Sequence, residues 1–518
     1  MNKSFSFVFK LSFTIILLSQ VLVAQEHKEL VQDVKTLVDK PLNFVEKVKE
    51  NYLVLKTLKN DSQNCVDYIL ERIKKIDNLT SNSFFPRTDN DKQILKEQGI
   101  ETLNRLFQIR GLIRDKQKEL AVDNKLNYQC LQSIKTATRY IRFMEEMLIE
   151  WLVDQNVIVP SESGILQAKS PQLMSNFEKG DSSSGILRKI GDIKDMLHSG
   201  DILMIRGQSY MSAMIARIGD AEMQFSHLAI VGLDENNEKV IVEALIPYGS
   251  KISSLNDWLT QKDPRVVLLR FEDKEVALKA GREAFKIATE FIQSHNKNIP
   301  YDFNMNAQDQ SQMFCSELIE NSFLKASEFK THLPQYKTLV TKFKSTPFLK
   351  SMGISMDTLF SPGDIEFDSR FQLVADYRFL ESSMNRSKTT LLRKIRMQDA
   401  IIQSLYNWMI QENYQLQPNL IVNMKVYLAK ALRMLGFYED KFPKHMPMES
   451  LSTIMYFEEI SKFFEEKLFI YEQDFYQKNG HSLHFQEMLN FLNSIKYSEC
   501  LDKDSQLNQL FKNRNCLG

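Results

Sequence analysis

Two apolar runs near the middle of the chain limit its fold more than any other feature. Residues 228–233 and 240–246 are rich in β-branched and aliphatic side chains, and the polar segment 234–238 between them is typical of a hairpin turn. Shorter apolar runs at 201–205 and 266–271 predict further strands of the same sheet. Because these strands cluster together, with helical spacing of apolar residues before and after them, an α+β domain is predicted and a βαβ array is not.

Long helical segments flank this domain on both sides. A chain of 518 residues exceeds one hydrophobic core, and its 17 glycines and 13 prolines are few enough to favour helices. Apolar residues from Phe371 to Leu380 are interpreted as the start of the second helical segment. The predicted organisation is a signal peptide at 1–24, an N-terminal helical domain at 25–159, a linker at 160–186, the α+β domain at 187–365 and a C-terminal helical domain at 366–518.

The N-terminus has the pattern of a secretory leader. Lys3 and Lys10 supply positive charge, residues 11–18 are mostly apolar, and the small residue Ala24 precedes polar sequence. We therefore expect an exported protein, periplasmic or secreted after cleavage; an uncleaved membrane anchor is the alternative. No later segment reaches the roughly 18 apolar residues that a membrane span needs.

The five cysteines fit an oxidising compartment. Cys65 and Cys130 share the N-terminal helical region, and Cys500 and Cys516 lie close together near the C-terminus. If these form two disulfides, Cys315 remains as a free thiol, which is worth attention in an exported protein. Sequence does not determine connectivity, and five reduced or buried cysteines remain the alternative.

Cys315, His227 and Glu243 are the candidate catalytic residues. Cys315 precedes an apolar helix whose N-terminus favours a thiolate, and His227 opens a core strand. Glu243 is the only charge in the second hairpin strand, and counting back from the turn places it within about two positions of His227. Each residue alone has a structural interpretation: a packed cysteine, a structural histidine, a solvent-facing edge carboxylate. Their conjunction points to a nucleophile, a base and an orienting group.

Five short motifs strengthen this interpretation. They are Gly200-Asp201-Ile202-Leu203, Ser226-His227-Leu228-Ala229-Ile230-Val231, Val242-Glu243-Ala244, Tyr301-Asp302-Phe303 and Phe314-Cys315-Ser316-Glu317-Leu318. As a set they resemble the permuted papain-like amidases of the YaeF/YiiX type, relatives of NlpC-type cell-wall peptidases and of lecithin:retinol acyltransferase-like enzymes. The resemblance covers roughly 170 residues and leaves out both helical regions. It implies a circularly permuted papain fold in which Cys315 is the nucleophile, His227 the base and Glu243 the third member of the triad.

Two further residues are weaker candidates. Tyr301 could donate to an oxyanion, and Glu317 could face an amine of the substrate. The alternatives are local: a Tyr-Asp turn at 301–302, and a first-turn carboxylate favoured by the helix dipole at Glu317.

The sequence therefore predicts an exported cysteine amidase or peptidase acting on a cell-wall peptide or an acylated amine. A lipid acyltransferase or thioesterase of the same fold, and a helical binding or scaffold protein with a vestigial domain, are the alternatives. Equal numbers of Lys+Arg and Asp+Glu, 66 each, argue against nucleic-acid binding. No cofactor or metal is expected: a Gly-rich phosphate loop is missing, and His481 and His484 lack a supporting cluster. A peptide, acyl-amine or lipid substrate and an association with the cell envelope are expected.

Overall fold

The computed structural model describes residues 44–57, 89–158, 164–168, 193–219, 223–306, 309, 311–344, 346–380, 390–437, 442–502 and 505–513. The predicted signal peptide lies outside these residues, and so do Cys65 and Cys516. Both predicted disulfides include one of those two cysteines, so the pairing stays a prediction. Among the cysteines that the structure does describe, Cys315 is a free thiol.

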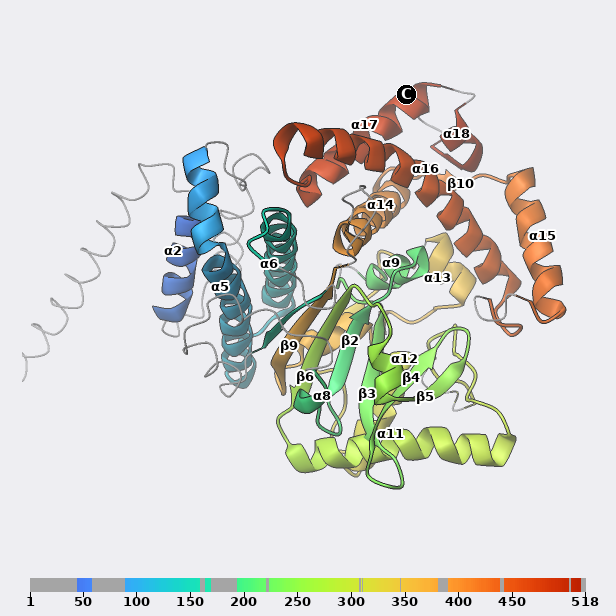
Figure 1. Ribbon diagram of the computed structural model, residues 1–518. Coiled ribbons are helices and arrows are strands. Elements are labelled where there is room, and N and C mark those ends of the chain that lie inside the picture. The colour runs from blue at the N-terminus through green and yellow to red at the C-terminus, as the bar shows by residue number, and fades with distance from the viewer. Residues whose placement is uncertain are drawn as a thin grey trace, which may run out of the picture.

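The centre of the molecule is an antiparallel sheet of seven strands in the order β1-β9-β6-β2-β3-β4-β5 (Figure 1). This sheet with helical flanks confirms the predicted α+β fold class. The two central apolar runs form the expected hairpin, β3 paired with β4. The strands are β1 (Gly164–Ala168), β2 (Ile202–Arg206), β3 (His227–Leu233), β4 (Lys239–Leu245), β5 (Gly249–Ser254), β6 (Arg265–Phe271) and β9 (Phe371–Phe379).

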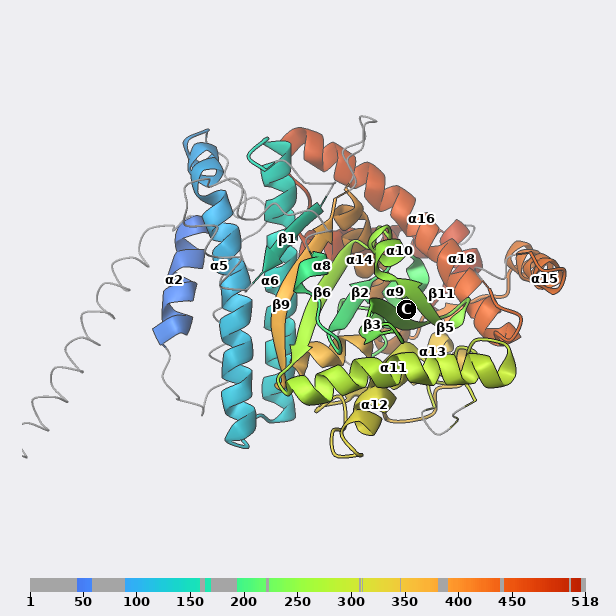
Figure 2. The same ribbon diagram turned by 60° about the horizontal axis from the view of Figure 1, so that its bottom comes forward.

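Helices α11 (Lys274–His295) and α12 (Cys315–Ala326) cover one face of the sheet (Figures 1 and 2). Asp273 caps α11 by accepting from the Glu275 and Val276 amides. The turn before β2 approaches α11 so closely that a Cβ on Gly200, which has φ +83°, would lie 2.0 Å from a backbone oxygen of the helix. Only glycine fits there, and this contact seats α11 against the end of β3.

Shorter helices pack elsewhere around the sheet. α8 (Ile193–Met196) and α10 (Leu255–Leu259) contribute apolar side chains to its second face. α9 (Tyr210–Ala216) follows β2, and α13 (Pro347–Met352) contacts the C-terminal helices. The 3₁₀-helix η4 (Pro362–Phe367) comes just before β9, and its buried Asp364 accepts from the Thr338 amide and hydroxyl.

The N-terminal helices form a layer beside the β1–β9 edge of the sheet (Figure 2). They are α2 (Phe44–Thr57), α5 (Asp89–Val122) and α6 (Tyr128–Asp154). Charged side chains enclosed between this layer and the sheet pair with one another; for example, Arg110 of α5 contacts Glu145 of α6 and Asp376 of β9. The helical layer and the sheet therefore share one enclosed ionic network.

The C-terminal helices lie over the end of the sheet where β3 begins (Figure 1). Aromatic side chains dominate their core, including Trp408, Phe457 and Phe464. The elements are α14 (Leu391–Gln411), α15 (Leu420–Met434), α16 (Met448–Asn479), α17 (Phe485–Leu501) and α18 (Gln506–Leu510), with two short pairs, β7 (Thr338–Leu339) with β8 (Thr358–Leu359) and β10 (Gln415–Leu416) with β11 (Phe511–Lys512). In the described part of the chain, no helix is both long and apolar enough to cross a membrane.

Two predictions of local structure are wrong. Residues 371–379 form strand β9 in the sheet and not the start of a helix, which is the structure that the sequence analysis predicts for them. Phe371, Leu373, Ala375, Tyr377 and Phe379 recur at every second position, and three of the four residues between them are polar or charged, which is the period of a strand. Within the predicted linker, residues 164–168 form β1 and pair with β9. Pairing with that neighbour, which sequence alone did not reveal, explains why a strand forms within the predicted linker.

Candidate active site

His227 and Glu243 meet across the hairpin. His227 is the first residue of β3, and Glu243 in β4 pairs with Ala229, so the two side chains are diagonal neighbours on one face. The His227 Nε2 lies 2.8 Å from Glu243 Oε2. Glu243 is 1% exposed, and among the described residues its Oε1 has no hydrogen-bond partner. The imidazole is therefore the group that this enclosed carboxylate orients and whose positive charge it stabilises.

Cys315 begins α12, the helix that packs against β3 and β4. Its residue is 4% exposed, and the preceding residue Phe314 provides no side-chain cap to the helix. The first-turn amides of α12 therefore carry their partial positive charge close to the sulfur. Because Glu243 binds Nε2 of His227, the other ring nitrogen, Nδ1, is the one available to the thiol.

The pKa values of Cys315 and His227 are shifted in opposite directions. Burial by itself raises the pKa of the Cys315 thiol, but hydrogen bonding and attraction to His227 outweigh burial and lower it. Burial acts to lower the pKa of the His227 imidazole, but its hydrogen bonds with Cys315 and Glu243 outweigh that effect and raise it to about 10. Both directions shift the pair toward thiolate and imidazolium, relative to an isolated thiol and imidazole.

Tyr301 is within electrostatic range of the Cys315 thiol. Burial, followed by the negative charge of Cys315, raises the pKa of Tyr301 well above its usual value, so its hydroxyl keeps its proton. Its backbone is held by a bridge to Met313, two residues before Cys315. The adjacent Asp302 turns inward and accepts from the amides of Asn304 and Asn306, which shapes the loop. A protonated phenol within electrostatic range of the thiol has the chemistry of an oxyanion donor, and that role for Tyr301 stays a prediction.

Glu317 is more enclosed than a substrate-binding carboxylate would be. It lies in the first turn of α12, its side chain is fully buried, and neither of its carboxylate oxygens has a hydrogen-bond partner within the described ranges. Burial, and then the negative charge of Asp302, raise the pKa of Glu317 to about 8. The carboxyl is therefore mostly protonated at pH 7, and its contact with a substrate amine stays a prediction.

Asp263 is a carboxylate near the site that the sequence analysis does not identify. Asp263 lies in the loop before β6, and burial raises its pKa to about 6 while the positive charge of His227 opposes the rise. The negative charge of Glu243 adds to the rise. Asp263 is thus within electrostatic range of both His227 and Glu243. The Asp263-Pro264 dipeptide before a strand is its only sequence signal, and that signal indicates a turn.

The segment that leads into His227 is fixed by arginines from distant parts of the chain. Gln224 has φ +62°, a strained value for a residue with a side chain. Its Oε1 accepts from Arg142 of α6 at 2.5 Å, and its backbone oxygen accepts from Arg265 of β6 at 2.9 Å. The Arg142 guanidinium also stacks over the Phe225 ring at 4.7 Å. Through these contacts the N-terminal helical layer helps to position His227.

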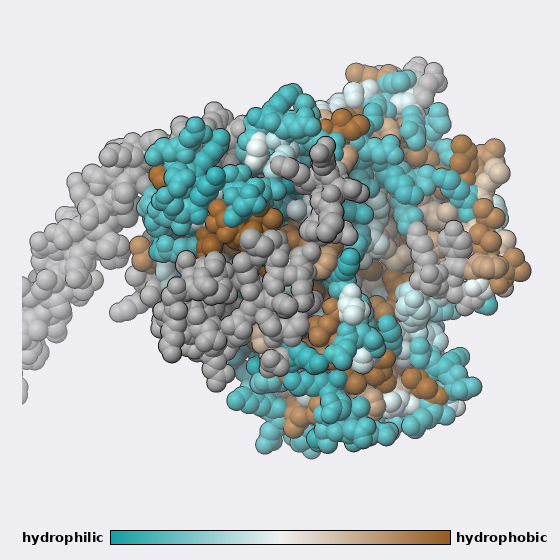
Figure 3. Space-filling model, in the orientation of Figure 1, coloured by the Kyte–Doolittle hydropathy of each residue, from teal (hydrophilic) through white to brown (hydrophobic). Residues whose placement is uncertain are grey.

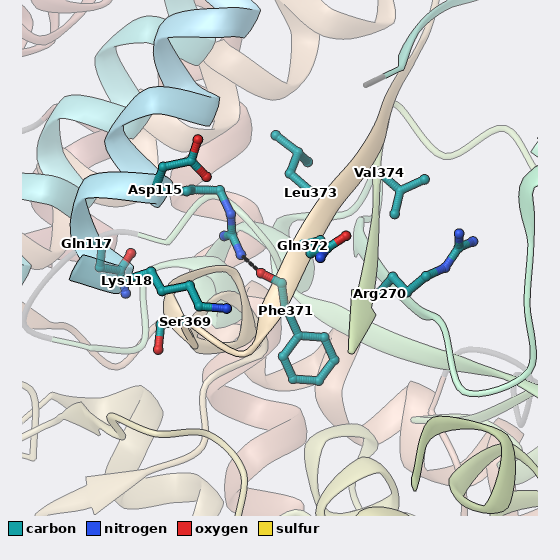
Figure 4. Close-up of a pocket in the computed structure, with 10 residues that line it drawn as sticks. Asp115, Gln117, Lys118, Arg270, Ser369, Phe371, Gln372, Leu373 and Val374 are labelled. Atoms are coloured by element: carbon teal, nitrogen blue, oxygen red, sulfur yellow. Dashed lines mark hydrogen bonds between the residues drawn. The ribbon is translucent and has the colours of Figure 1, made fainter. Parts of the chain in front are cut away.

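A pocket lies toward the opposite end of the same strands. It has a volume of about 490 Å³ and opens between α5 and the start of β9 (Figure 4). Its cations are already engaged: Arg114 donates to the Phe371 carbonyl, Lys118 pairs with Glu272, and Arg270 pairs with Asp201. His227 pairs with the far end of β2, next to Val266 of β6, whereas Arg270 is near the other end of β6. The pocket is therefore separate from the site of the thiol.

A cysteine, a histidine and a carboxylate gathered at one end of an antiparallel sheet, with the cysteine opening a helix, define a papain-like arrangement in which the histidine comes first in the chain. Residues 196–362 match the family described as permuted papain-like amidase enzymes, YaeF/YiiX, C92 family, which confirms the resemblance for this part of the chain. The match over this part of the chain indicates a hydrolase of the amidase type.

A solved structure is also similar to part of the chain. The metalloprotein YiiX from Escherichia coli O157:H7 shares 19% identity, covers 34% of this chain and 96% of its own, and gives a TM-score of 0.27. The comparison with curated proteins found no match. Within the described residues of the present chain, no group of three or more His, Cys, Asp or Glu side chains is arranged to hold a metal ion.

Proposed function

We propose that the protein is a cysteine hydrolase that cleaves an amide bond through Cys315, His227 and Glu243. One observation carries the proposal: the His227 ring is hydrogen-bonded to the enclosed Glu243 at 2.8 Å while it also interacts with the Cys315 thiol. This is the order of contacts that a nucleophile, a general base and an orienting carboxylate need.

The reaction proceeds in two halves. The Cys315 thiolate attacks the carbonyl carbon of the substrate, and the C–N bond breaks as the His227 imidazolium gives its proton to the departing amine. The product of this half is a thioester on Cys315. His227, now neutral, accepts a proton from a water molecule that attacks the thioester carbon, and the acid leaves as the thiolate and imidazolium are restored. Atoms and charge balance without a cofactor.

Donors are available for the negative oxygen that forms in each half. The backbone N–H of Cys315 opens an uncapped helix, and the protonated Tyr301 hydroxyl is within electrostatic range of the sulfur. Preorganised donors of this kind commonly contribute about 10²–10³-fold to the rate. We assign Tyr301 and the Cys315 amide to this role.

The substrate class is testable through the covalent intermediate. Incubation with an N-acyl peptide, an N-acyl amine or an acyl-lipid ester should add the mass of the acyl group to the tryptic peptide that contains Cys315. We expect the two amides to acylate Cys315 and to turn over. If only the lipid ester acylates the protein, the acyltransferase or thioesterase alternative replaces the amidase. If no substrate gives an adduct, the proposed function fails.

We also propose that the protein is exported and acts at the cell envelope. The charged and apolar pattern of the first 24 residues supports this location. The intact mass recorded in the same experiment, on protein from its native host, should correspond to a chain that begins near Gln25. A mass that includes Met1 to Ala24 would contradict cleavage of the leader.

Replacing Glu243 with glutamine should shift the pH dependence of Cys315 reactivity. The wild-type alkylation rate should fall as the pH falls through the lowered pKa of Cys315, because the thiolate is protonated there. In Glu243→Gln the imidazolium loses its anionic partner, so the pKa of His227 falls, that of Cys315 rises, and the acid limb moves to higher pH. We expect kcat/KM to fall on the order of 10²-fold.

Iodoacetamide labelling rates between pH 4 and pH 9 measure this shift directly. Glu235→Gln, an exposed change in the turn of the same hairpin, is the matched control and should leave the profile unchanged. An unaltered acid limb in Glu243→Gln would show that the carboxylate does not support the imidazolium.

A further inference from the structure

Helix α15 has two faces of similar apolar character, and only one of them is covered. Val422, Val426 and Ala429 are buried, and α15 packs along α16. The opposite face carries large apolar side chains that are 60–76% exposed: Leu420, Ile421, Met424, Tyr427, Leu428 and Met434. Leu435 and Phe437 in the following turn extend it, at 72% and 61% exposed. We call these eight residues the α15 face.

The α15 face lies at the edge of the molecule. Figure 1 shows α15 projecting from the C-terminal helices, and Figure 3 shows apolar side chains gathered at the same place on the surface. Most soluble proteins scatter their exposed apolar residues, and a contiguous set of this kind marks a surface that binds something. Other exposed apolar side chains, such as Ile470 and Tyr497, belong to α16 and α17 and lie outside α15.

The charge around this face identifies the kind of partner. Residues 413–437 contain no Asp or Glu, and they include Lys425, Lys430 and Arg433. At 3.6 residues per turn, the two lysines fall at the two borders of the apolar face. Glu459 of α16 accepts from Lys425 at 2.8 Å and also contacts Lys462. Two lysines thus share one carboxylate, and the net charge of these three side chains is positive. Apolar residues flanked by lysines are the pattern of a helix that lies in a membrane interface.

We propose that the α15 face docks the protein onto a lipid surface that contains anionic headgroups. The apolar side chains would enter the boundary between headgroups and acyl chains, while the flanking lysines would stay at the level of the phosphates. The proposal does not depend on the hydrolase activity, because binding to lipid is measured without turnover.

The same helix is connected to the candidate active site. Arg433, in the last turn of α15, donates to the carbonyls of Met446 at 3.0 Å and Pro443 at 3.3 Å. His445, between these two residues, hydrogen-bonds to the backbone of Tyr301 and places its ring 5.4 Å from that of Phe303. Docking through α15 would therefore hold the loop that contains Tyr301 in a set orientation to the lipid surface.

Flotation with vesicles tests the docking. We expect the full chain to bind vesicles of phosphatidylcholine with phosphatidylglycerol, and to bind phosphatidylcholine vesicles more weakly. Met424→Gln combined with Leu428→Gln, which preserves helix propensity on an exposed face, should weaken binding about tenfold or more. Ile470→Gln combined with Tyr497→Gln, equally exposed positions outside α15, is the matched control and should bind as the wild type does. Lys430→Gln should reduce the preference for the anionic vesicles.

A tryptophan reporter locates the contact. Trp151, Trp258 and Trp408 are 2–4% exposed, so lipids with brominated acyl chains should hardly quench the wild-type fluorescence. Tyr427→Trp should be quenched once vesicles are added. The proposal is overturned if no vesicle binds, if both lipid compositions bind equally, or if the α15 variant changes a dimer into a monomer while vesicle binding is unaltered. In the last case a second copy of the chain occupies the face.

Discussion

Replacing Cys315 with alanine should lower kcat for any substrate of the enzyme by about 10⁴-fold or more, because the thioester can no longer form. The change removes one sulfur atom from a buried position and leaves the α12 backbone intact. His227→Gln should cost a similar factor, since a thiol without its base is mostly protonated and the departing amine receives no proton. Steady-state rates on the amide that acylates the wild type measure both.

Two comparisons distinguish lost chemistry from lost structure. The double variant Cys315→Ala, His227→Gln should be no slower than either single variant, because residues that act as one catalytic unit are strongly non-additive. Far-ultraviolet circular dichroism and the unfolding midpoint of Cys315→Ala should match those of the wild type. A Cys315→Ala protein that stays folded and still turns over substrate would remove the thiol from the mechanism.

The sequence could predict the contact between His227 and Glu243 because the hairpin makes this contact local. Sixteen residues separate His227 from Glu243, and a turn at 234–238 determines which strand positions face one another. Cys315 was identified for a different reason: its chemistry and its helix could be read from one stretch of residues. That His227 and Glu243 lie close to Cys315 is what the family resemblance implies, and the matched residues 196–362 include all three.

The parts that sequence could not predict depend on contacts between distant segments. Strand β1 is ordered by pairing with β9, more than 200 residues later. Arg142 and Gln224 are 82 residues apart in the sequence. Hydrophobic periodicity does not predict that an arginine in a helix will hydrogen-bond to the segment before His227. The sequence also does not predict that the α15 face is exposed. The spacing of Tyr427, Leu428 and Leu435 is the same as that of apolar residues on a buried helix.

Contacts between distant segments also join the flanking helices to the central sheet. Substitution of Glu146 is the most direct way to measure how much this connection stabilises the protein. Glu146 of α6 accepts from Arg265 of β6 at 2.7 Å and 3.1 Å, and Arg396 of α14 lies 3.8 Å away. All three side chains are fully buried. Each of them comes from a different predicted domain. One carboxylate thus joins the N-terminal helices, the sheet and the C-terminal helices.

Glu146→Ala should lower the free energy of unfolding by about 3–5 kcal/mol, because it leaves buried guanidinium groups without their anion. Urea unfolding, followed by Trp fluorescence, measures this loss. Glu146→Gln should lose less, since the amide oxygen still accepts from Arg265. Lys478→Ala, which removes an exposed pair with Asp474, should cost no more than about 1 kcal/mol.

The effect should also reach the active site. Arg265 holds the backbone oxygen of Gln224, three residues before His227, so weakening its anchor should loosen the base. We therefore expect Glu146→Gln to reduce the alkylation rate of Cys315 even under conditions in which the variant is fully folded. If Glu146→Ala costs less than about 1 kcal/mol and leaves Cys315 reactivity unchanged, the flanking helices stabilise and position the site by some route other than this ionic network.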